Sequence, residues 1–186
     1  GNSNQLQRQT LRYKNLCARF RALYNEEPNF IIRAPGRANI IGEHIDYMGF
    51  SVMPFALEND TLIAGSTNTS NLVQLNHTDD MKFDPVTFDA EGKNLKVDTT
   101  NGVQWYNYFQ CGYRGFFDEA AEQGKIVAPK GMNLVVNTTV PLGSGLSSSS
   151  SFVVCSFLAS ARAHDIAFNQ QEVGTRCQKC EGYIGT

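Results

Sequence analysis

A run of glycine and serine residues is the first stretch whose composition suggests chemistry. Pro141-Leu142-Gly143-Ser144-Gly145-Leu146 is followed by five serines, Ser147 to Ser151. A strand-like segment, 132–136, precedes the run and an apolar helical segment follows it, so the run would lie at a helix N-terminus, where unpaired amides and the helix dipole attract anions. The glycines allow close backbone approach to a phosphate, and the hydroxyls of Ser147, Ser148 and Ser149 add donors or a magnesium ligand.

Other interpretations of this run can be weighed from the same residues. A Walker loop is excluded because the G-x-x-x-x-G-K-[ST] spacing and its lysine are absent. A nucleophile elbow, G-x-S-x-G, is excluded because Gly143-Ser144-Gly145 breaks that register. A flexible glycine–serine linker stays open as an alternative. The run is short, however, and joins two apolar elements, which favours a phosphate-binding loop.

A second cluster of chemically active side chains follows Pro35. Arg37, Glu43, His44 and Asp46 lie within ten residues and are flanked by apolar residues. Carboxylates and an imidazole held together can bind the hydroxyls of a polyol, and a nearby arginine can stabilise charge on a transferring phosphoryl group. A structural salt-bridge cluster explains the same residues equally well, and His44 with Asp46 is too small a ligand set to specify a metal.

The spacing of apolar residues predicts the elements of the first half. Residues 16–24 predict a helix that ends before Pro28, and Phe30 to Ile32 a short strand that ends at the breaker cluster Ala34-Pro35-Gly36. Strand-like segments follow at 40–41, 52–57, 62–64, 72–75 and 86–88. The last two lie in a polar stretch, 67–102, which we expect to form hairpins and loops.

Helices predominate in the second half. Apolar residues recur with helical spacing from Trp105 to Phe116, and 152–163 predicts another helix. A last helix begins near Asn169, with Glu172 in a capping-box relation, and places Glu181 at the edge of its buried stripe. Because strands and helices do not alternate regularly, the predicted fold class is α+β rather than a doubly wound sheet.

The composition is that of an ordinary soluble protein. The 186 residues are 41% apolar and 18% charged, enough to bury the core of one domain, 1–186. The net charge of −2 provides no basic field for nucleic acid or a membrane surface. Five scattered cysteines, an odd number, indicate reduced thiols and a cytoplasmic location. Cys177 and Cys180 are interpreted as core residues one helical turn apart rather than zinc ligands.

Together the two chemical stretches resemble the galactokinase branch of the GHMP sugar and metabolite kinases. The sequence from Arg33 to Tyr47 is similar to the galactokinase signature almost throughout, and Pro141 to Ser149 resembles the superfamily's P-x-x-x-G-L-S-S-S phosphate motif. The resemblance covers residues 13 to 186. Ile45, the run Trp105 to Phe109 and the end Tyr183 to Thr186 favour the N-acetylgalactosamine kinase subgroup.

This resemblance implies the N-terminal domain of a GHMP kinase (ribosomal protein S5 domain 2-like), a mixed sheet packed with helices. It also implies ATP-dependent phosphorylation of the anomeric hydroxyl of galactose or N-acetylgalactosamine, which yields the sugar 1-phosphate. Trp105 would form a wall of the adenine pocket, although anchoring its helix in the core explains it equally well. The other implied roles are sugar binding by Glu43, His44, Ile45 and Asp46, transition-state stabilisation by Arg37, enclosure of the triphosphate by Gly143 to Ser149, and Mg²⁺ binding by Ser149 and Glu181.

The chain departs from the family pattern in three places. Ser150 stands where the family usually has alanine, and Ala38 where it usually has valine. Both exchanges are minor, and in the first a small side chain replaces another small one. In the family a catalytic aspartate and a second lobe follow the position of Thr186, so we expect a truncated chain without its general base.

Two alternatives to a kinase stay open. A galactokinase-like sensor would bind sugar and ATP and act through a protein partner without turnover. A separate small binding module would use only this part of the family's sequence. Exposed apolar surface where the second lobe would dock would argue against such a module.

Overall fold

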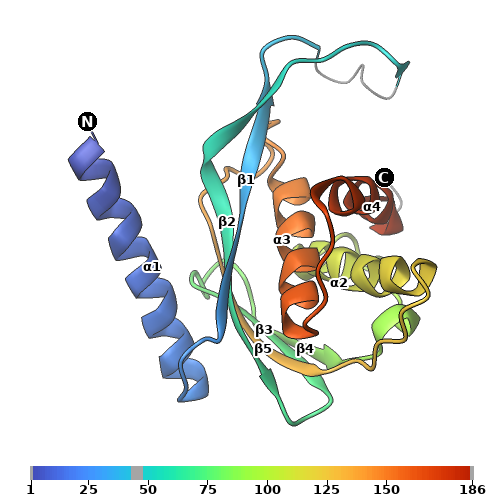
Figure 1. Ribbon diagram of the computed structural model, residues 1–186. Coiled ribbons are helices and arrows are strands. Elements are labelled where there is room, and N and C mark those ends of the chain that lie inside the picture. Colours follow the sequence, from blue (N-terminus) through green and yellow to red (C-terminus); the bar gives the residue numbers. More distant parts are fainter. Residues whose placement is uncertain (1, 43–47, 185–186) are drawn as a thin grey trace.

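The computed structural model describes residues 2–42 and 48–184, and its core is a five-stranded sheet with helices on both faces (Figure 1). In chain order the elements are α1 (Asn2–Tyr24), β1 (Phe30–Asn39), β2 (Pro54–Asn68), β3 (Leu72–His77), β4 (Val86–Asp89), the short η2 (Gly92–Asn94), α2 (Trp105–Glu122), β5 (Gly131–Thr138), α3 (Ser148–Ala163), α4 (Gln170–Glu181) and the short η3 (Gly182–Ile184). The predicted α+β class and mixed sheet are confirmed.

The strand order is β1-β2-β5-β3-β4. Strands β1 and β2, β2 and β5, and β3 and β4 pair antiparallel, whereas β3 and β5 are parallel. The parallel pair is joined by β4 and α2, because a parallel crossover needs a long connection. Strand β5 therefore lies in the middle of the sheet, and the glycine–serine run leaves from its carboxyl end.

Strand β1 does not end at Ala34-Pro35-Gly36, so the prediction of a breaker there was wrong. The strand continues to Asn39, with a register shift between Pro35 and Arg37 where it pairs with β2. Strand β1 is an edge strand, so a proline without an amide hydrogen costs no ladder hydrogen bond on the open side. A bulge absorbs the irregularity and redirects the strand beyond it.

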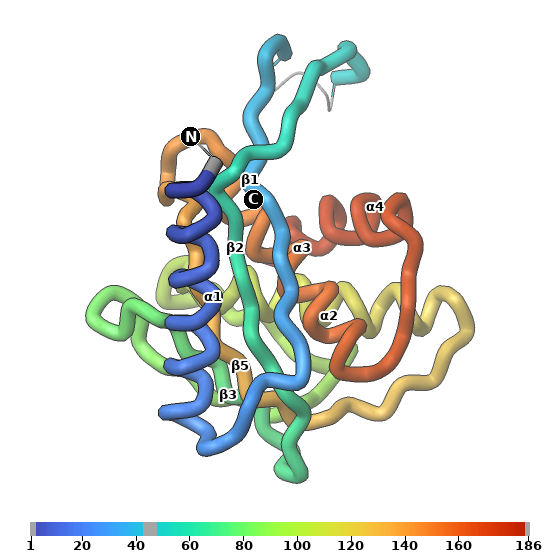
Figure 2. The backbone as a smooth tube through the Cα atoms, turned by 60° about the vertical axis from the view of Figure 1, so that its left-hand side comes forward, coloured from blue at the N-terminus to red at the C-terminus, as the bar shows by residue number. Residues whose placement is uncertain are grey.

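Strand β2 is longer than its sequence pattern indicated. The segments predicted at 52–57 and 62–64 belong to one strand of 15 residues, Pro54–Asn68. Only its second half is buried, from Asp60 to Ser66. The first half pairs with the end of β1 in a hairpin that extends beyond the rest of the sheet (Figure 2). Its weak alternation follows from this, since exposed residues on both sides give no period of two.

Helices α2, α3 and α4 cover one face of the sheet and enclose the main core. Helix α2 crosses α3 at Gly112, where a Cβ would lie 2.3 Å from the carbonyl oxygen of Val153. This explains why a glycine stands on the apolar stripe of α2. The predicted capping box of α4 is confirmed, because Glu172 N donates to Asn169 Oδ1 and Asn169 N donates to Glu172 Oε2, both at 2.9 Å.

Helix α1 packs on the opposite face of the sheet, as Figures 1 and 2 both show. Its Leu16 and Phe20 form a second, smaller core with apolar residues of β2 and β5. Asp60 of β2 has only 1% of its side chain exposed and pairs with Arg12 of α1 and Arg33 of β1. Removing water from a carboxylate is costly unless cations compensate it, so these pairs hold α1 to the sheet.

All five cysteines are free thiols, and Cys177 and Cys180 lie in the main core as predicted. Burial raises the pKa of the Cys111 thiol to about 12, so this thiol stays protonated at neutral pH. Within residues 2–42 and 48–184, no helix has the length and apolar character needed to cross a membrane.

Candidate nucleotide and sugar site

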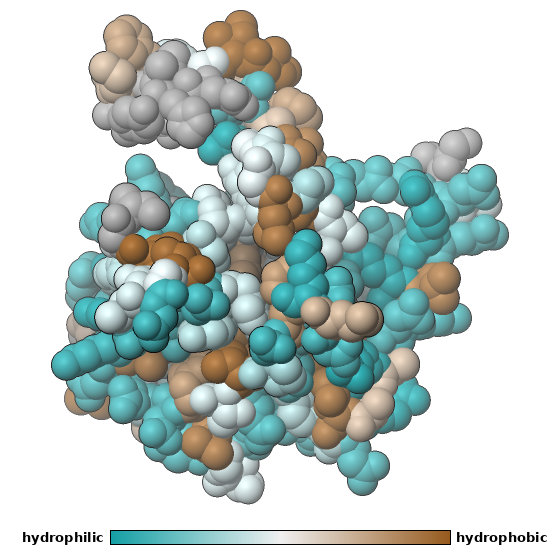
Figure 3. All heavy atoms as spheres, turned by 180° about the vertical axis from the view of Figure 1, so that it is seen from behind, coloured by the Kyte–Doolittle hydropathy of each residue, from teal (hydrophilic) through white to brown (hydrophobic). Residues whose placement is uncertain are grey.

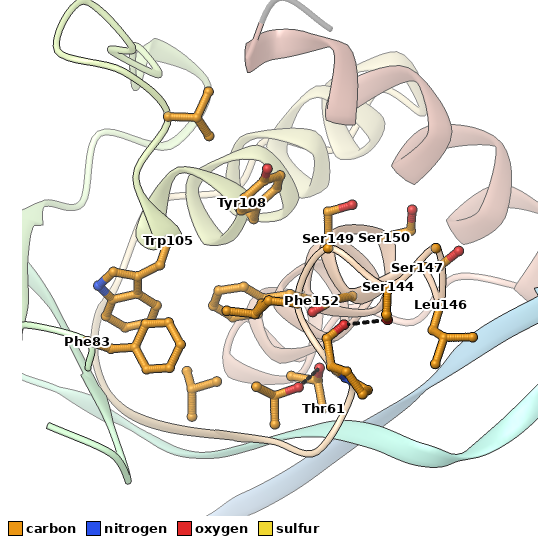
Figure 4. A pocket seen from close by; sticks show the side chains of 18 of the residues that line it. Thr61, Phe83, Trp105, Tyr108, Ser144, Leu146, Ser147, Ser149, Ser150 and Phe152 are labelled. Atoms are coloured by element: carbon orange, nitrogen blue, oxygen red, sulfur yellow. Dashed lines mark hydrogen bonds between the residues drawn. The ribbon is translucent and has the colours of Figure 1, made fainter. Parts of the chain in front are cut away.

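A cavity of about 740 Å³ lies between the start of α2, the end of β5 and the loop that leads into α3 (Figure 4). Its size is within the usual range of pockets for small molecules. Aromatic side chains line one end and the glycine–serine loop lines the other. Most of the loop residues singled out from the sequence are here: Gly143, Ser144, Gly145, Leu146, Ser147, Ser148 and Ser149 all line the cavity, as do Arg37 and Trp105.

Aromatic rings form the apolar end of the cavity. Trp105 and Phe152 are nearly parallel, with an interplanar angle of 6° and ring centroids 6.1 Å apart. The ring centroids of Phe83 and Trp105 are 5.6 Å apart, and Trp105 Nε1 donates to the carbonyl oxygen of Asp84 at 3.2 Å. Figure 4 shows Phe83 and Trp105 together at one side, with Phe152 between them and the serines of the loop. Trp105 is half-buried, so one surface anchors α2 while another faces the cavity. Trp105 therefore both lines the cavity and packs against the main core.

His77 lies beneath these rings and is 5% exposed. Its ring centroid is 4.2 Å from that of Phe83. Burial lowers the pKa of His77 to about 4, so the ring is neutral at physiological pH. The backbone amide of Asp79 donates to Nδ1 at 2.9 Å, which assigns the proton of the neutral ring to Nε2.

The backbone of the glycine–serine loop alternates in handedness. Gly143, Gly145 and Ser147 have left-handed φ values of 66°, 72° and 57°, whereas Ser144 and Leu146 between them do not. Alternation of left-handed and right-handed residues is the backbone pattern that can form a concave anion-binding nest. The loop then leads directly into α3, whose first amides lack intrahelical acceptors. The combination makes this end of the cavity suited to phosphate.

Strand β1 is joined to the loop by one backbone hydrogen bond. The amide of Arg37 donates to the carbonyl oxygen of Leu146 at 3.1 Å. Gly36 permits this approach, because a Cβ there would lie 2.9 Å from the same oxygen and 3.1 Å from a methyl of Val140. The Arg37 side chain is exposed and belongs to the cavity lining. The hydrogen bond from its amide fixes the strand that carries it relative to the loop.

Glu181, the last residue of α4, comes close to the start of α3. Its Oε2 accepts a hydrogen bond from the hydroxyl of Ser150 at 2.8 Å. Ser149 lines the cavity, whereas Glu181 is not part of its lining. The described residues contain no group of three or more His, Cys, Asp or Glu side chains able to hold a metal by themselves. A cation here would therefore need oxygens from a ligand as well.

Glu43, His44, Ile45 and Asp46 lie outside the described residues. The segments on either side of them are paired, because Ile40 N donates to Met53 O at 2.9 Å and Met53 N donates to Ile41 O at 3.0 Å. Apolar side chains gather at this far end of the hairpin, at the top of Figure 3. The large exposed ones are Ile40, Ile41, Met48, Phe50, Met53 and Phe55. Such a surface is typical of an interaction site and disfavours a separate small binding module.

Among the cavity-wall residues that sequence analysis did not assign to the site are His77 and three aromatic residues, Phe83, Tyr108 and Phe152. Tyr108 could have been found, since it lies one helical turn from Trp105 and shares its face. His77 continues the alternation of buried residues in β3 and reaches the cavity through its pairing with Val136 of β5, whereas Phe83 lies in the segment between β3 and β4, where no period marks it.

Comparison with known proteins agrees with this geometry. The galactokinase galactose-binding signature matches residues 18–67, and the GHMP kinase N-terminal domain matches residues 107–186. The galactokinase of Candida maltosa is 36% identical over 161 residues, which are 86% of this chain and 73% of that protein. The chain belongs to the galactokinase family.

Other relatives are considerably longer than the chain. The galactokinase of Dictyostelium discoideum is 38% identical over 94% of this chain, which spans only 34% of that protein. The crystal structure of Lactococcus lactis galactokinase complexed with galactose superimposes with a TM-score of 0.77 at 25% identity, over 94% of this chain and 43% of that one. A mevalonate kinase, with a TM-score of 0.70 at 20% identity, shares the fold.

Proposed function

We propose that the whole protein transfers the γ-phosphoryl group of ATP to the anomeric hydroxyl of galactose or N-acetylgalactosamine and releases the sugar 1-phosphate. The chain spans about a third of the length of several of its relatives, so the proposal concerns the full-length protein. Membership of the galactokinase family supports it, as does the galactose in the related crystal structure.

One observation carries the nucleotide half of the proposal: a single cavity has an aromatic end and an anion-binding end. A purine is flat and apolar, and rings such as Trp105 and Phe152 bind flat π systems by stacking. The triphosphate carries the negative charge, for which the left-handed turns at Gly143, Gly145 and Ser147 and the start of α3 provide amide donors. ATP therefore lies with its base at α2 and its phosphates at the loop.

Arg37 acts between the phosphate loop and the sugar. Its guanidinium stabilises the negative charge that develops on the transferring phosphoryl group in the transition state. The hydrogen bond from the Arg37 amide to Leu146 supports this role, because it fixes the strand against the loop. Glu43, His44, Ile45 and Asp46 bind the sugar in this proposal, on the strength of their match to the galactose-binding signature.

Mg²⁺ fits the oxygen donors next to the loop. It is a hard cation that takes hydroxyl, carboxylate and phosphate oxygens and usually has few protein ligands. Ser149 supplies a hydroxyl from the cavity wall, and Glu181 a carboxylate next to the neighbouring Ser150. When bound, the cation neutralises phosphate charge. The protein's own task is to hold these two oxygens at the start of α3.

The test is coupled ADP release with ATP and Mg²⁺, using galactose or N-acetylgalactosamine in separate reactions. It compares the 186-residue chain with the full-length gene product. Sugar-dependent turnover by the full-length product is expected, and the better sugar identifies the substrate. Sugar binding without turnover in the full-length product would replace the kinase proposal with the non-catalytic sensor.

A further inference from the structure

The hydroxyl of Ser150 is the only one described in α3 whose hydrogen bond reaches another helix. Ser156 and Ser160 donate to carbonyl oxygens one turn back in the same helix, at 2.7 and 2.9 Å. Ser150 instead donates to Glu181 Oε2 at 2.8 Å, across the interface between α3 and α4. Both side chains are half-buried. The Ser150 hydroxyl therefore binds the Glu181 carboxylate rather than a carbonyl oxygen of its own helix.

The second feature is the set of partners that the Glu181 carboxylate has among the described residues. Within residues 2–42 and 48–184, no arginine, lysine or histidine forms an ion pair with it. Only Oε2 has a hydrogen-bond donor among these residues, which leaves Oε1 available. A divalent cation next to this carboxylate would be attracted by its charge and could be bound through the remaining oxygen.

We propose that Ser150 is a positioning residue that orients the Glu181 carboxylate toward the divalent cation accompanying the nucleotide. Its hydroxyl holds Oε2 and leaves Oε1 for a cation bound next to Ser149. This inference rests on the proposed function, since it needs a metal–nucleotide complex at the loop. Metal-ligating carboxylates are commonly hydrogen-bonded in this way, and losing such a partner typically weakens metal affinity by about 10–100-fold.

Three substitutions in the full-length protein separate orientation from simple packing. Ser150→Ala removes the hydroxyl and introduces the residue that the related motif usually has. Ser150→Thr retains a hydroxyl at the same position. Tyr183→Phe is the matched control, because it removes a different hydroxyl bond between η3, which follows α4, and α2, from Tyr183 Oη to Asp118 Oδ2 at 2.6 Å.

The measurement is the ADP dissociation constant by calorimetry, with EDTA and with saturating Mg²⁺, together with Mn²⁺ affinity by electron paramagnetic resonance. In Ser150→Ala, the gain in ADP affinity that Mg²⁺ provides should fall about tenfold, and Mn²⁺ affinity should fall with it. ADP affinity in EDTA should stay unchanged. Ser150→Thr and Tyr183→Phe should both retain the wild-type dependence on metal.

Several results would overturn the inference alone. Ser150→Ala could keep the wild-type metal dependence, or bind Mn²⁺ more tightly because the hydroxyl competes with the cation for Glu181. An equal loss of ADP affinity with and without metal would show a packing role. A wild-type protein that binds no ADP under either condition would instead refute the proposed function, and the inference with it.

Discussion

Replacing Gly36 with alanine should disturb the phosphate loop through a single contact. The backbone φ of Gly36 is not left-handed, so alanine can adopt its conformation. The added Cβ, however, would lie 2.9 Å from the Leu146 carbonyl oxygen and 3.1 and 3.2 Å from the methyls of Val140. A carbonyl cannot turn aside as a flexible side chain can. The loop must therefore move away from β1, which breaks the bond from the Arg37 amide.

The magnitude follows from the two effects that combine at this position. A lost backbone hydrogen bond costs about 1 kcal/mol, and overpacking about 1–3 kcal/mol. We expect unfolding free energy to decrease by about 2–4 kcal/mol, a large fraction of the stability of an ordinary domain. ADP affinity should also fall, because Leu146 lies between the left-handed residues Gly145 and Ser147 of the nest.

Urea unfolding and ADP calorimetry on the full-length protein measure both effects. Gly174→Ala is the matched control, since Gly174 lies in α4 with no atom within 4 Å of an added Cβ. This control should be neutral or stabilise by up to about 1 kcal/mol through helix propensity. If Gly36→Ala unfolds at the wild-type urea concentration and binds ADP normally, then the close approach of β1 to the loop has no energetic importance.

Three further predictions concern the packing that supports the site. Gly112→Ala should destabilise by roughly 3 kcal/mol or more, because its Cβ would meet the Val153 carbonyl oxygen at 2.3 Å and push α2 from α3; a wild-type melting temperature would contradict this. Asp60→Asn should cost about 3 kcal/mol in urea unfolding, because it leaves two arginine partners without their buried carboxylate; no loss would mean that solvent replaces it. Burial lowers the pKa of His77 to about 4, so the unfolded chain takes up its proton near pH 6.5 and the folded chain only near pH 4. As the pH is lowered from about 6.5 to about 4, the free energy of unfolding should therefore fall by up to about 3 kcal/mol, whereas above pH 6.5 His77 should cause no change. His77→Asn should remove this part of the pH dependence; an unchanged pH dependence would contradict the assignment.

The parts of the molecule that local sequence determines were predicted well. The capping box at Asn169 and the apolar stripe of α2 depend on contacts within a few residues, so their patterns are visible in the chain. The place of the glycine–serine loop in a cavity was equally accessible, because glycines at 143 and 145 have the left-handed backbone that its turns require.

What sequence could not provide depends on contacts between distant segments. The prediction failed at Pro35, because only the position of β1 at the sheet edge makes a proline acceptable there. His77 belongs to the cavity because β3 runs parallel to β5, and Phe83 because its ring packs on His77; no local pattern reveals either contact. The same applies to Ser150, whose partner Glu181 is 31 residues away on another helix.

Phosphorus NMR of the reaction products tests the central claim most directly. The full-length protein would be supplied with ATP, Mg²⁺ and either galactose or N-acetylgalactosamine. The account predicts ADP and a new phosphate monoester signal that is split by the anomeric proton of the sugar. A sugar phosphorylated at another hydroxyl, or ADP formed at the same rate without sugar, would contradict it.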